Sequence, residues 1–202
     1  MDIKIPYTPR KHQSYLHKQI DKNRWSVLVC HRRFGKTVCM INHLIRSALL
    51  SKLKNPRFAY IAPTFKQAKS IAWDYMKQFT NKIPYIKFNE TELRVDLPNG
   101  SRITLLGSDS PDGLRGIYLD GCVIDEYANV NSKLFPEIIR PALSDRKGYC
   151  VFIGTPAGMN NNFYELYQHS QGAEDWFNYK AKASETKIVD PDELVKAKEV
   201  MG

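Results

Sequence analysis

Gly35, Lys36 and Thr37 have the types and the order of residues in a phosphate-binding loop. They follow the apolar run Trp25–Cys30, which predicts a buried strand, and a polar turn, and they open a stretch with helical periodicity. In such a loop, backbone N–H groups at the helix start hold phosphates, the lysine reaches the β and γ oxygens, and the threonine hydroxyl is a ligand for Mg²⁺. The usual first glycine of the loop is a cysteine here, and Gly-Lys-Thr also occurs in ordinary strand-to-helix turns.

A second chemical signal is the acid pair Asp125 and Glu126, which follows the apolar run Cys122–Ile124. Ligands bind at the carboxyl ends of strands in α/β sheets, so this pair is predicted to lie beside the phosphate loop. There Asp125 would hold Mg²⁺ through water, and Glu126 would orient and deprotonate an attacking water. A solvated Asp-Glu helix start is the alternative when the pair is considered alone.

Alternating apolar patterns predict the elements that position these residues. Helices are expected over Gln13–Lys22, Thr37–Leu53, Phe65–Phe79, Asn162–Gln168 and Pro191–Val200. Further strands are expected over Arg57–Ala62, Tyr149–Ile153 and Trp176–Ala183, with a hairpin of Leu93–Leu97 and Arg102–Leu106 as an antiparallel insertion or edge. The predicted fold is α/β: a three-layer P-loop NTPase with a mostly parallel sheet, in which residues from about 160 to 202 form a small lid or linker.

The charge of this chain is unevenly distributed. Residues 1–54 hold twelve Lys/Arg against two acids, whereas the whole chain carries a net charge of +9, so the basic surplus is entirely N-terminal. Such a surplus is compatible with nucleotide or nucleic-acid phosphates, and equally with a solvated basic face. The four cysteines lack C-x-x-C spacing, which argues against disulfide frameworks and zinc sites, and no apolar run reaches the length of a membrane span. We expect a soluble, intracellular protein with no membrane contact.

Taken in order, these motifs resemble the ATPase domain of the large terminase subunit of tailed bacteriophages, a motor that pumps viral DNA into a capsid. Residues 9–13 are similar to its adenine-contacting segment, and Cys30 to Thr37 to its deviant, arginine-bearing Walker A motif. Ala62-Pro63-Thr64 with Gln67-Ala68 is similar to the family's following segment. Val123 to Tyr127 resembles Walker B with its catalytic glutamate, and Gly154-Thr155-Pro156 the motif that couples hydrolysis to movement.

The resemblance implies a role for each matching residue. Nucleotide contacts are expected from Arg10, Gln13, His31, Arg33, Phe34, Gly35, Lys36, Thr37 and Val38. Arg32 lies where these motors keep a phosphate-sensing arginine, a task that Arg33 could share unless it is only solvated. Arg115, in a loop predicted over Gly107–Gly116, lies where some terminases present an arginine finger to the neighbouring subunit. A guanidinium beside the γ-phosphate stabilises the transition state. The alternative is that Arg115 is a surface loop residue of its own subunit.

The resemblance also implies ATP and Mg²⁺ as cofactors, sequence-independent contact with double-stranded DNA, and a homo-oligomeric ring with portal and small-subunit partners in the host cytoplasm. The family's large subunit continues into a metal-dependent nuclease domain, and no matching acidic cluster is visible, so residues 1–202 are expected to be the motor domain alone. A helicase-like remodelling ATPase is a rival hypothesis, although it needs a second lobe. A non-hydrolysing nucleotide-binding or DNA-binding scaffold is another.

Overall fold

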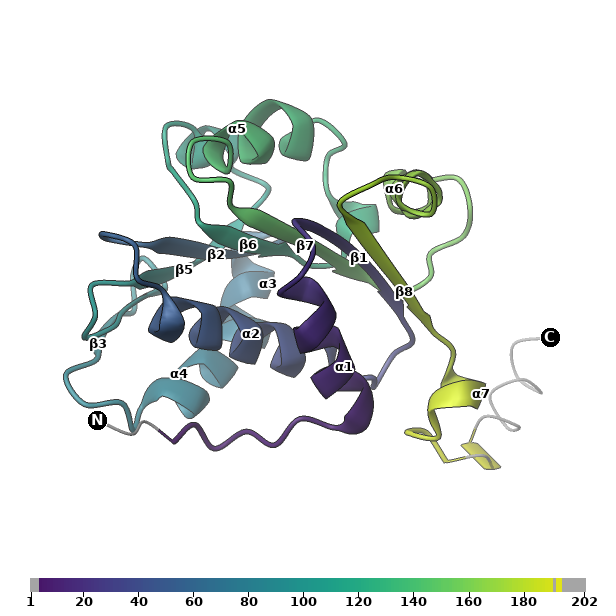
Figure 1. The fold of residues 1–202 in the computed structure, drawn as a ribbon, viewed down its shortest axis with the longest axis horizontal. Helices are drawn as coiled ribbons and strands as arrows, with labels where there is room; N and C mark the ends of the chain where they lie inside the picture. The colour runs from purple at the N-terminus through teal and green to yellow at the C-terminus, as the bar shows by residue number, and fades with distance from the viewer. Residues whose placement is uncertain (1–3, 191, 194–202) are drawn as a thin grey trace.

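The computed structural model describes residues 4–190 and 192–193. Its centre is an eight-stranded sheet with the order β3-β4-β5-β2-β6-β7-β1-β8 (Figure 1). All neighbouring pairs are parallel except β3 with β4 and β4 with β5. The strands are β1 Trp25–Cys30, β2 Arg57–Ala62, β3 Lys87–Asn89, β4 Arg94–Asp96, β5 Arg102–Gly107, β6 Gly121–Ile124, β7 Tyr149–Gly154 and β8 Trp176–Ala181.

Helices cover both faces of this sheet and complete the three layers (Figure 1). On one face lie α1 (Lys11–Ile20), α2 (Lys36–Leu50) and a continuous helical run made of α3 (Phe65–Gln67), the π-helical η1 (Ala68–Trp73) and α4 (Asp74–Thr80). On the other lie η4 (Phe135–Ile139), α5 (Arg140–Ala142) and α6 (Asn162–Ser170). The remaining short elements are η2 (Pro111–Leu114), η3 (Tyr127–Asn129) and α7 (Ala183–Thr186).

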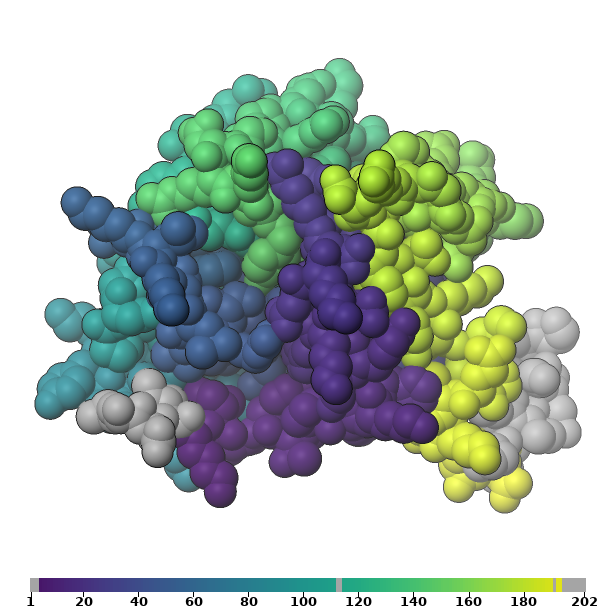
Figure 2. Space-filling view, viewed as in Figure 1, coloured from purple at the N-terminus to yellow at the C-terminus, as the bar shows by residue number. Residues whose placement is uncertain are grey.

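The N-terminal segment closes one side of the molecule. Figure 2 shows the purple N-terminal part spread across the centre of this face and touching the yellow C-terminal part. A hydrogen bond of 2.8 Å between His12 Nδ1 and the Tyr179 hydroxyl joins α1 to β8. Two buried apolar clusters, one on each face of the sheet, form the core.

Most predicted elements are confirmed, including β1 and β2 with their predicted bounds. The predicted hairpin forms as the antiparallel pair β4 and β5, towards one end of the sheet. β5 also pairs in parallel with β2, and β3, which we did not predict, is the outer strand. The predicted strand Trp176–Ala183 ends at Ala181, since Ala183 opens α7. The helical turns over Phe135–Ala142 were also not predicted, because each short piece contains a proline near its start.

The C-terminal region expected to be a lid or linker contributes α6 and β8 to the three-layer core. The helix predicted over Pro191–Val200 lies largely outside the described residues. All four cysteines are buried, as the sequence predicted. Within the described ranges, no helix combines the length and the apolar character required to cross a membrane.

Candidate nucleotide site

The loop between β1 and α2 is the one that the sequence predicts to bind phosphate. Two of its residues have left-handed backbones, Gly35 with φ of 86° and Arg33 with φ of 64°. A Cβ atom at Gly35 would lie 3.0 Å from Gln13 Nε2, so glycine suits both the conformation and the space. Cys30, which takes the place of the usual first glycine, is not among the described residues with positive φ, so its backbone does not require glycine.

The lysine of the loop is folded back over its backbone. Lys36 Nζ donates to the carbonyl oxygens of Cys30, at 3.3 Å, and His31, at 3.5 Å. These weak neutral acceptors hold the ammonium group above the loop. A phosphate oxygen would be a stronger, charged acceptor at the same place.

The N-terminal segment supports the loop from outside. Gln13 Nε2 donates to the Gly35 carbonyl at 3.3 Å, Gln13 Oε1 accepts from Arg10 N at 3.0 Å, and Arg10 Nη1 donates to the Phe34 carbonyl at 3.4 Å. Gln13 is buried, and the Phe34 side chain packs fully into the core. Phe34, expected among the nucleotide contacts, can therefore offer a nucleotide only its backbone.

The other expected loop residues differ in exposure. Arg32 and Arg33 are exposed, whereas Val38 is half-buried against the core. A 2.8 Å hydrogen bond between His31 Nε2 and Thr186 Oγ1 joins the loop to α7. Thr186 was not predicted to contribute to the site.

The acid pair follows β6, as predicted. Its first residue, Asp125, contacts Tyr60, which we did not predict as a site residue. The Tyr60 hydroxyl of β2 donates a short hydrogen bond to Asp125 Oδ2 and lies within hydrogen-bonding reach of the Thr37 hydroxyl. Burial raises the pKa of the Asp125 carboxyl above its usual range, and the neighbouring Glu126 charge adds to this shift. The hydrogen bond from Tyr60 and the positive charge of Lys36 lower the pKa of Asp125 and so oppose this shift. A tyrosine within an otherwise apolar, buried strand was the available signal, since a buried hydroxyl needs a partner.

Glu126 has a left-handed backbone, with φ of 44° and ψ of 50°, which is unusual for a residue that is not glycine. Its backbone N–H donates to Asp125 Oδ1 at 2.9 Å. Its Oε2 accepts hydrogen bonds from Thr155 Oγ1 at 3.1 Å and from Thr155 N at 3.3 Å. Strained backbones of this kind occur most often at functional sites.

The sheet order explains why these groups meet. Strand β7 lies between β1 and β6, so Thr155, directly after β7, lies between the phosphate loop and the acid pair. Gly154 ends β7 where a Cβ atom would lie 2.9 Å from a ring carbon of Phe163, so α6 packs closely behind this turn. Pro156 follows, and it lines a small apolar hollow beside α6.

Arg115 is exposed, in the loop before β6. It borders hollows that also touch η4. The structure brings together the phosphate loop, Gln13, Thr37, the acid pair and Thr155, and none of these residues lines the hollows beside Arg115.

The sequence matches the family described as "Terminase large subunit, T4likevirus-type, N-terminal" over residues 29–190. The chain belongs to the terminase large-subunit family. The terminase large subunit of Thermus virus P23-45 is 30% identical over 182 residues, which cover 81% of this chain and 36% of that protein. That of Thermus phage G20c gives the same values. The chain thus spans about a third of the length of the curated relatives it matches.

Solved terminases share the fold. The large terminase ATPase domain of Thermus phage P74-26 is similar with a TM-score of 0.79 and 21% identity, over 98% of this chain and 90% of that chain. The large terminase of a thermophilic bacteriophage, solved in complex with ADP, gives a TM-score of 0.78 and 15% identity, over 95% of this chain and 50% of that chain. These similarities confirm the α/β fold class predicted from the sequence.

Proposed function

We propose that this terminase domain binds Mg-ATP at the loop between β1 and α2 and hydrolyses it to drive double-stranded DNA into a viral capsid. The observation that carries the proposal is Glu126: a carboxylate on a strained backbone, oriented by Thr155 and placed after β6 beside the loop that holds Lys36. Solved relatives support it, because one is described as an ATPase domain and another was solved with ADP and with ATP-gamma-S.

Each residue of the site has its own proposed role. Lys36 would exchange its two carbonyl acceptors for phosphate oxygens, and backbone N–H groups at the start of α2 would bind the same phosphates. Glu126 would orient the attacking water and accept its proton. Arg32, exposed on the loop, would contact the γ-phosphate within its own subunit, and Arg10 and Gln13 would keep the loop in shape around the nucleotide.

The oxygen donors near the loop fit Mg²⁺. Thr37 and Asp125 both reach the Tyr60 hydroxyl, so a hydroxyl and a carboxylate face the same place. Mg²⁺ is held by few protein oxygens together with substrate phosphates. When bound, it would neutralise charge on the β and γ oxygens, and Thr37 and Asp125 are the residues proposed to hold it.

Coupling to DNA is proposed for Gly154, Thr155 and Pro156, because Thr155 contacts the Glu126 carboxylate directly. We further propose that the domain acts in a homo-oligomeric ring with portal and small-subunit partners, in the cytoplasm of the infected bacterial cell. Contact with DNA would be electrostatic and independent of sequence. Residues 1–202 would act in this assembly as one ATPase unit.

The decisive experiment compares Mg-ATP turnover and ATP binding in the wild type and Glu126→Gln. We expect turnover to fall by about 10²-fold or more while ATP binding is retained, since removing the base affects the chemical step. Glu174→Gln, an exposed acid in the turn before β8, is the matched control and should behave as the wild type. Wild-type turnover in Glu126→Gln would exclude Glu126 as the base. Absence of ATP binding by the wild type would refute the proposed function and leave a scaffold.

A further inference from the structure

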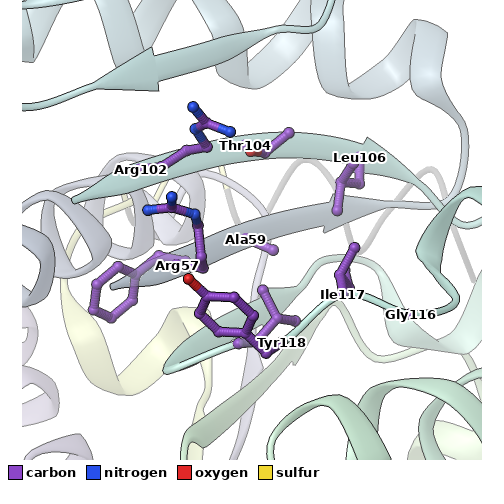
Figure 3. Close-up of a pocket in the computed structure, with 10 residues that line it drawn as sticks. Arg57, Ala59, Arg102, Thr104, Leu106, Gly116, Ile117 and Tyr118 are labelled. Carbon is purple, nitrogen blue, oxygen red and sulfur yellow. The ribbon is translucent and has the colours of Figure 1, made fainter. Parts of the chain in front are cut away.

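A separate cavity, of about 320 Å³, lies along β5 and β2 on the sheet face that carries η4 and α5 (Figure 3). Its polar end is at Arg57 and Arg102, the first residues of β2 and β5. The proposed nucleotide site follows the last residues of β1 and β6, so this polar end belongs to the opposite edge of the sheet. Nothing in the proposed ATPase reaction uses it.

The polar end places two positive charges together. Arg57 and Arg102 are direct partners in the parallel register of β2 and β5, and Figure 3 shows their guanidinium groups close together on one side of the sheet. Like charges directly opposite each other on neighbouring strands are destabilising. Asp96 pairs with Arg102 and offsets part of that cost, and a bound anion would offset the charge of Arg57 as well.

The existing partners of these arginines leave donors unused. Arg102 Nε donates to Asp96 Oδ1 at 2.6 Å, and Arg57 Nη1 donates to the carbonyls of Pro56, at 3.1 Å, and Gly100, at 3.2 Å. In the described part of the chain, no carboxylate forms an ion pair with Arg57. Over the same residues, Arg57 Nη2 and both Nη atoms of Arg102 have no hydrogen-bond partner. The cavity therefore offers N–H groups from two guanidinium groups to a ligand.

The Tyr118 ring packs beside Arg57 at the polar end of the cavity. The Arg57 Cζ atom lies 5.9 Å from the centre of the Tyr118 ring, and Arg146 Cζ lies 4.4 Å from it. The Tyr118 hydroxyl donates to the Asn55 carbonyl at 2.9 Å. A ring fixed in this way limits the side-chain freedom that Arg57 would lose on binding a ligand.

The rest of the cavity is apolar. Ala59, Leu106 and Ile117 line it beyond the arginines, with the Thr104 hydroxyl between the two ends (Figure 3). A DNA phosphate is flanked by polar sugars and would leave this apolar part unfilled. A carboxylate on an aliphatic stem matches both ends, because guanidinium groups bind carboxylates through paired N–H groups and the stem can cover apolar side chains.

We propose that this cavity binds an acidic side chain of a partner protein, a glutamate or aspartate with apolar neighbours in its own sequence. The carboxylate would lie between Arg57 and Arg102, and the apolar part would contact Leu106 and Ile117. The partner would also touch the loop that carries Arg115, because Gly116, Ile117 and Tyr118 line the cavity. The proposal does not depend on ATP hydrolysis.

The probe is a blocked pentapeptide, acetyl-Ala-Leu-Glu-Leu-Ala-amide, and its control is the same peptide with glutamine at the centre. Binding is followed by amide shifts in two-dimensional NMR spectra of the whole chain. We expect the glutamate peptide to shift Thr104 and Ile117 and to bind about tenfold more tightly than the glutamine peptide, as one charge-assisted pair would give. Equal binding of the two peptides, or shifts confined to other surfaces, would overturn the proposal.

Variants of the two arginines complete the test. The double variant Arg57→Gln with Arg102→Gln should abolish the difference in affinity between the two peptides. Arg57→Lys should reduce this difference, because lysine keeps the positive charge but lacks the paired N–H donors of the guanidinium group. Arg46→Gln is the matched control: it removes a charge from α2 that pairs with Asp21 and shares no partner with either arginine, and it should keep the difference. A short duplex DNA that displaces the glutamate peptide and loses its own affinity in the double variant would identify a phosphate site and overturn the peptide proposal.

Discussion

Glu126 and Thr155 form a two-point contact: Glu126 Oε2 lies 3.1 Å from Thr155 Oγ1 and 3.3 Å from Thr155 N. The two residues follow the neighbouring strands β6 and β7, so the sheet itself sets their separation. Because a hydrogen bond to a charged group contributes about 1.5–3 kcal/mol, this contact is strong enough to fix the orientation of the carboxylate. A change in the backbone at Thr155 must therefore also move Glu126.

Thr155→Val should lower kcat by about tenfold or more while ATP affinity stays close to that of the wild type. The substitution keeps the shape of the side chain but removes one of the two donors to Glu126, at a cost on the order of 1.5 kcal/mol. Steady-state kinetics and ATP binding measure the two effects. Thr155→Ser keeps the hydroxyl and should retain most of the turnover. If the serine variant loses as much turnover as the valine variant, the hydroxyl is not what orients Glu126.

Tyr60→Phe should destabilise the fold by about 1–3 kcal/mol, because it leaves the buried Asp125 carboxyl without its side-chain donor. Urea unfolding measures the change in the free energy of unfolding. Tyr127→Phe is the control, since Tyr127 is also buried but its hydroxyl has no hydrogen-bond partner among the described residues. The same loss in both variants would mean that the cost comes from packing and not from Asp125.

The contrast between Tyr60 and the acid pair shows what the sequence could predict. Asp125 and Glu126 were found because they directly follow an apolar run, a pattern that local sequence contains in full. Tyr60 meets Asp125 only because β2 lies next to β6, and strand order depends on contacts between distant segments. For the same reason, the contacts of Glu126 with Thr155 and of His31 with Thr186 could not be derived from spacing.

The boundaries of helices and strands were also predictable only where the local sequence contains the signal. The bounds of β1 and β2 were predicted correctly because each is a mostly apolar run next to turn-forming or polar residues. β3 was missed because it is only three residues long and has one apolar residue, Phe88, which is too few to show an alternating pattern. The place of β5 inside the sheet was missed because a hairpin pattern records its pairing with β4 and contains nothing about its second neighbour, β2.

Stability should decrease as the pH falls below 6.5, because two stacked histidines join α1 to α2. His17 and His43 have ring centres 5.3 Å apart and Nδ1 atoms 3.0 Å apart, a contact in which only one nitrogen can carry the proton. Burial lowers the pKa of His17 to about 4 and that of His43 to about 3. The nearby Arg46 contributes to the lowering of both pKa values, whereas Asp21 opposes it.

The sign of this effect follows from the lowered pKa values. In acid below pH 6.5 the unfolded chain binds protons that the folded chain does not, so the free energy of unfolding falls by up to about 1.4 kcal/mol per pH unit for each histidine. Urea unfolding between pH 7 and pH 5 measures this slope. Asp21, whose pKa is lowered, loses its contribution only in more acidic solution. His17→Asn should reduce the slope, and His169→Asn, an exposed control on α6, should not. An unchanged slope in His17→Asn would contradict the assignment.

Arg115 should act on the active site of a neighbouring subunit, since its side chain is exposed and the hollows that it borders are not lined by the loop, the acid pair or Thr155. Turnover per chain should then rise with protein concentration, and Arg115→Ala should lose about 10³-fold in turnover under assembled conditions. Arg140→Ala, an exposed arginine on α5, is the matched control and should keep the wild-type rate.

Mixing two inactive variants separates action between subunits from action within one. Arg115→Ala keeps Glu126, and Glu126→Gln keeps Arg115, so a mixed assembly contains boundaries at which one subunit supplies the base and its neighbour supplies the arginine. We expect turnover to reappear on mixing and to depend on the ratio of the two variants. If the mixture stays inactive while the wild-type assembly turns over, Arg115 acts within its own subunit, and the loop after β5 must move toward the nucleotide to bring it there.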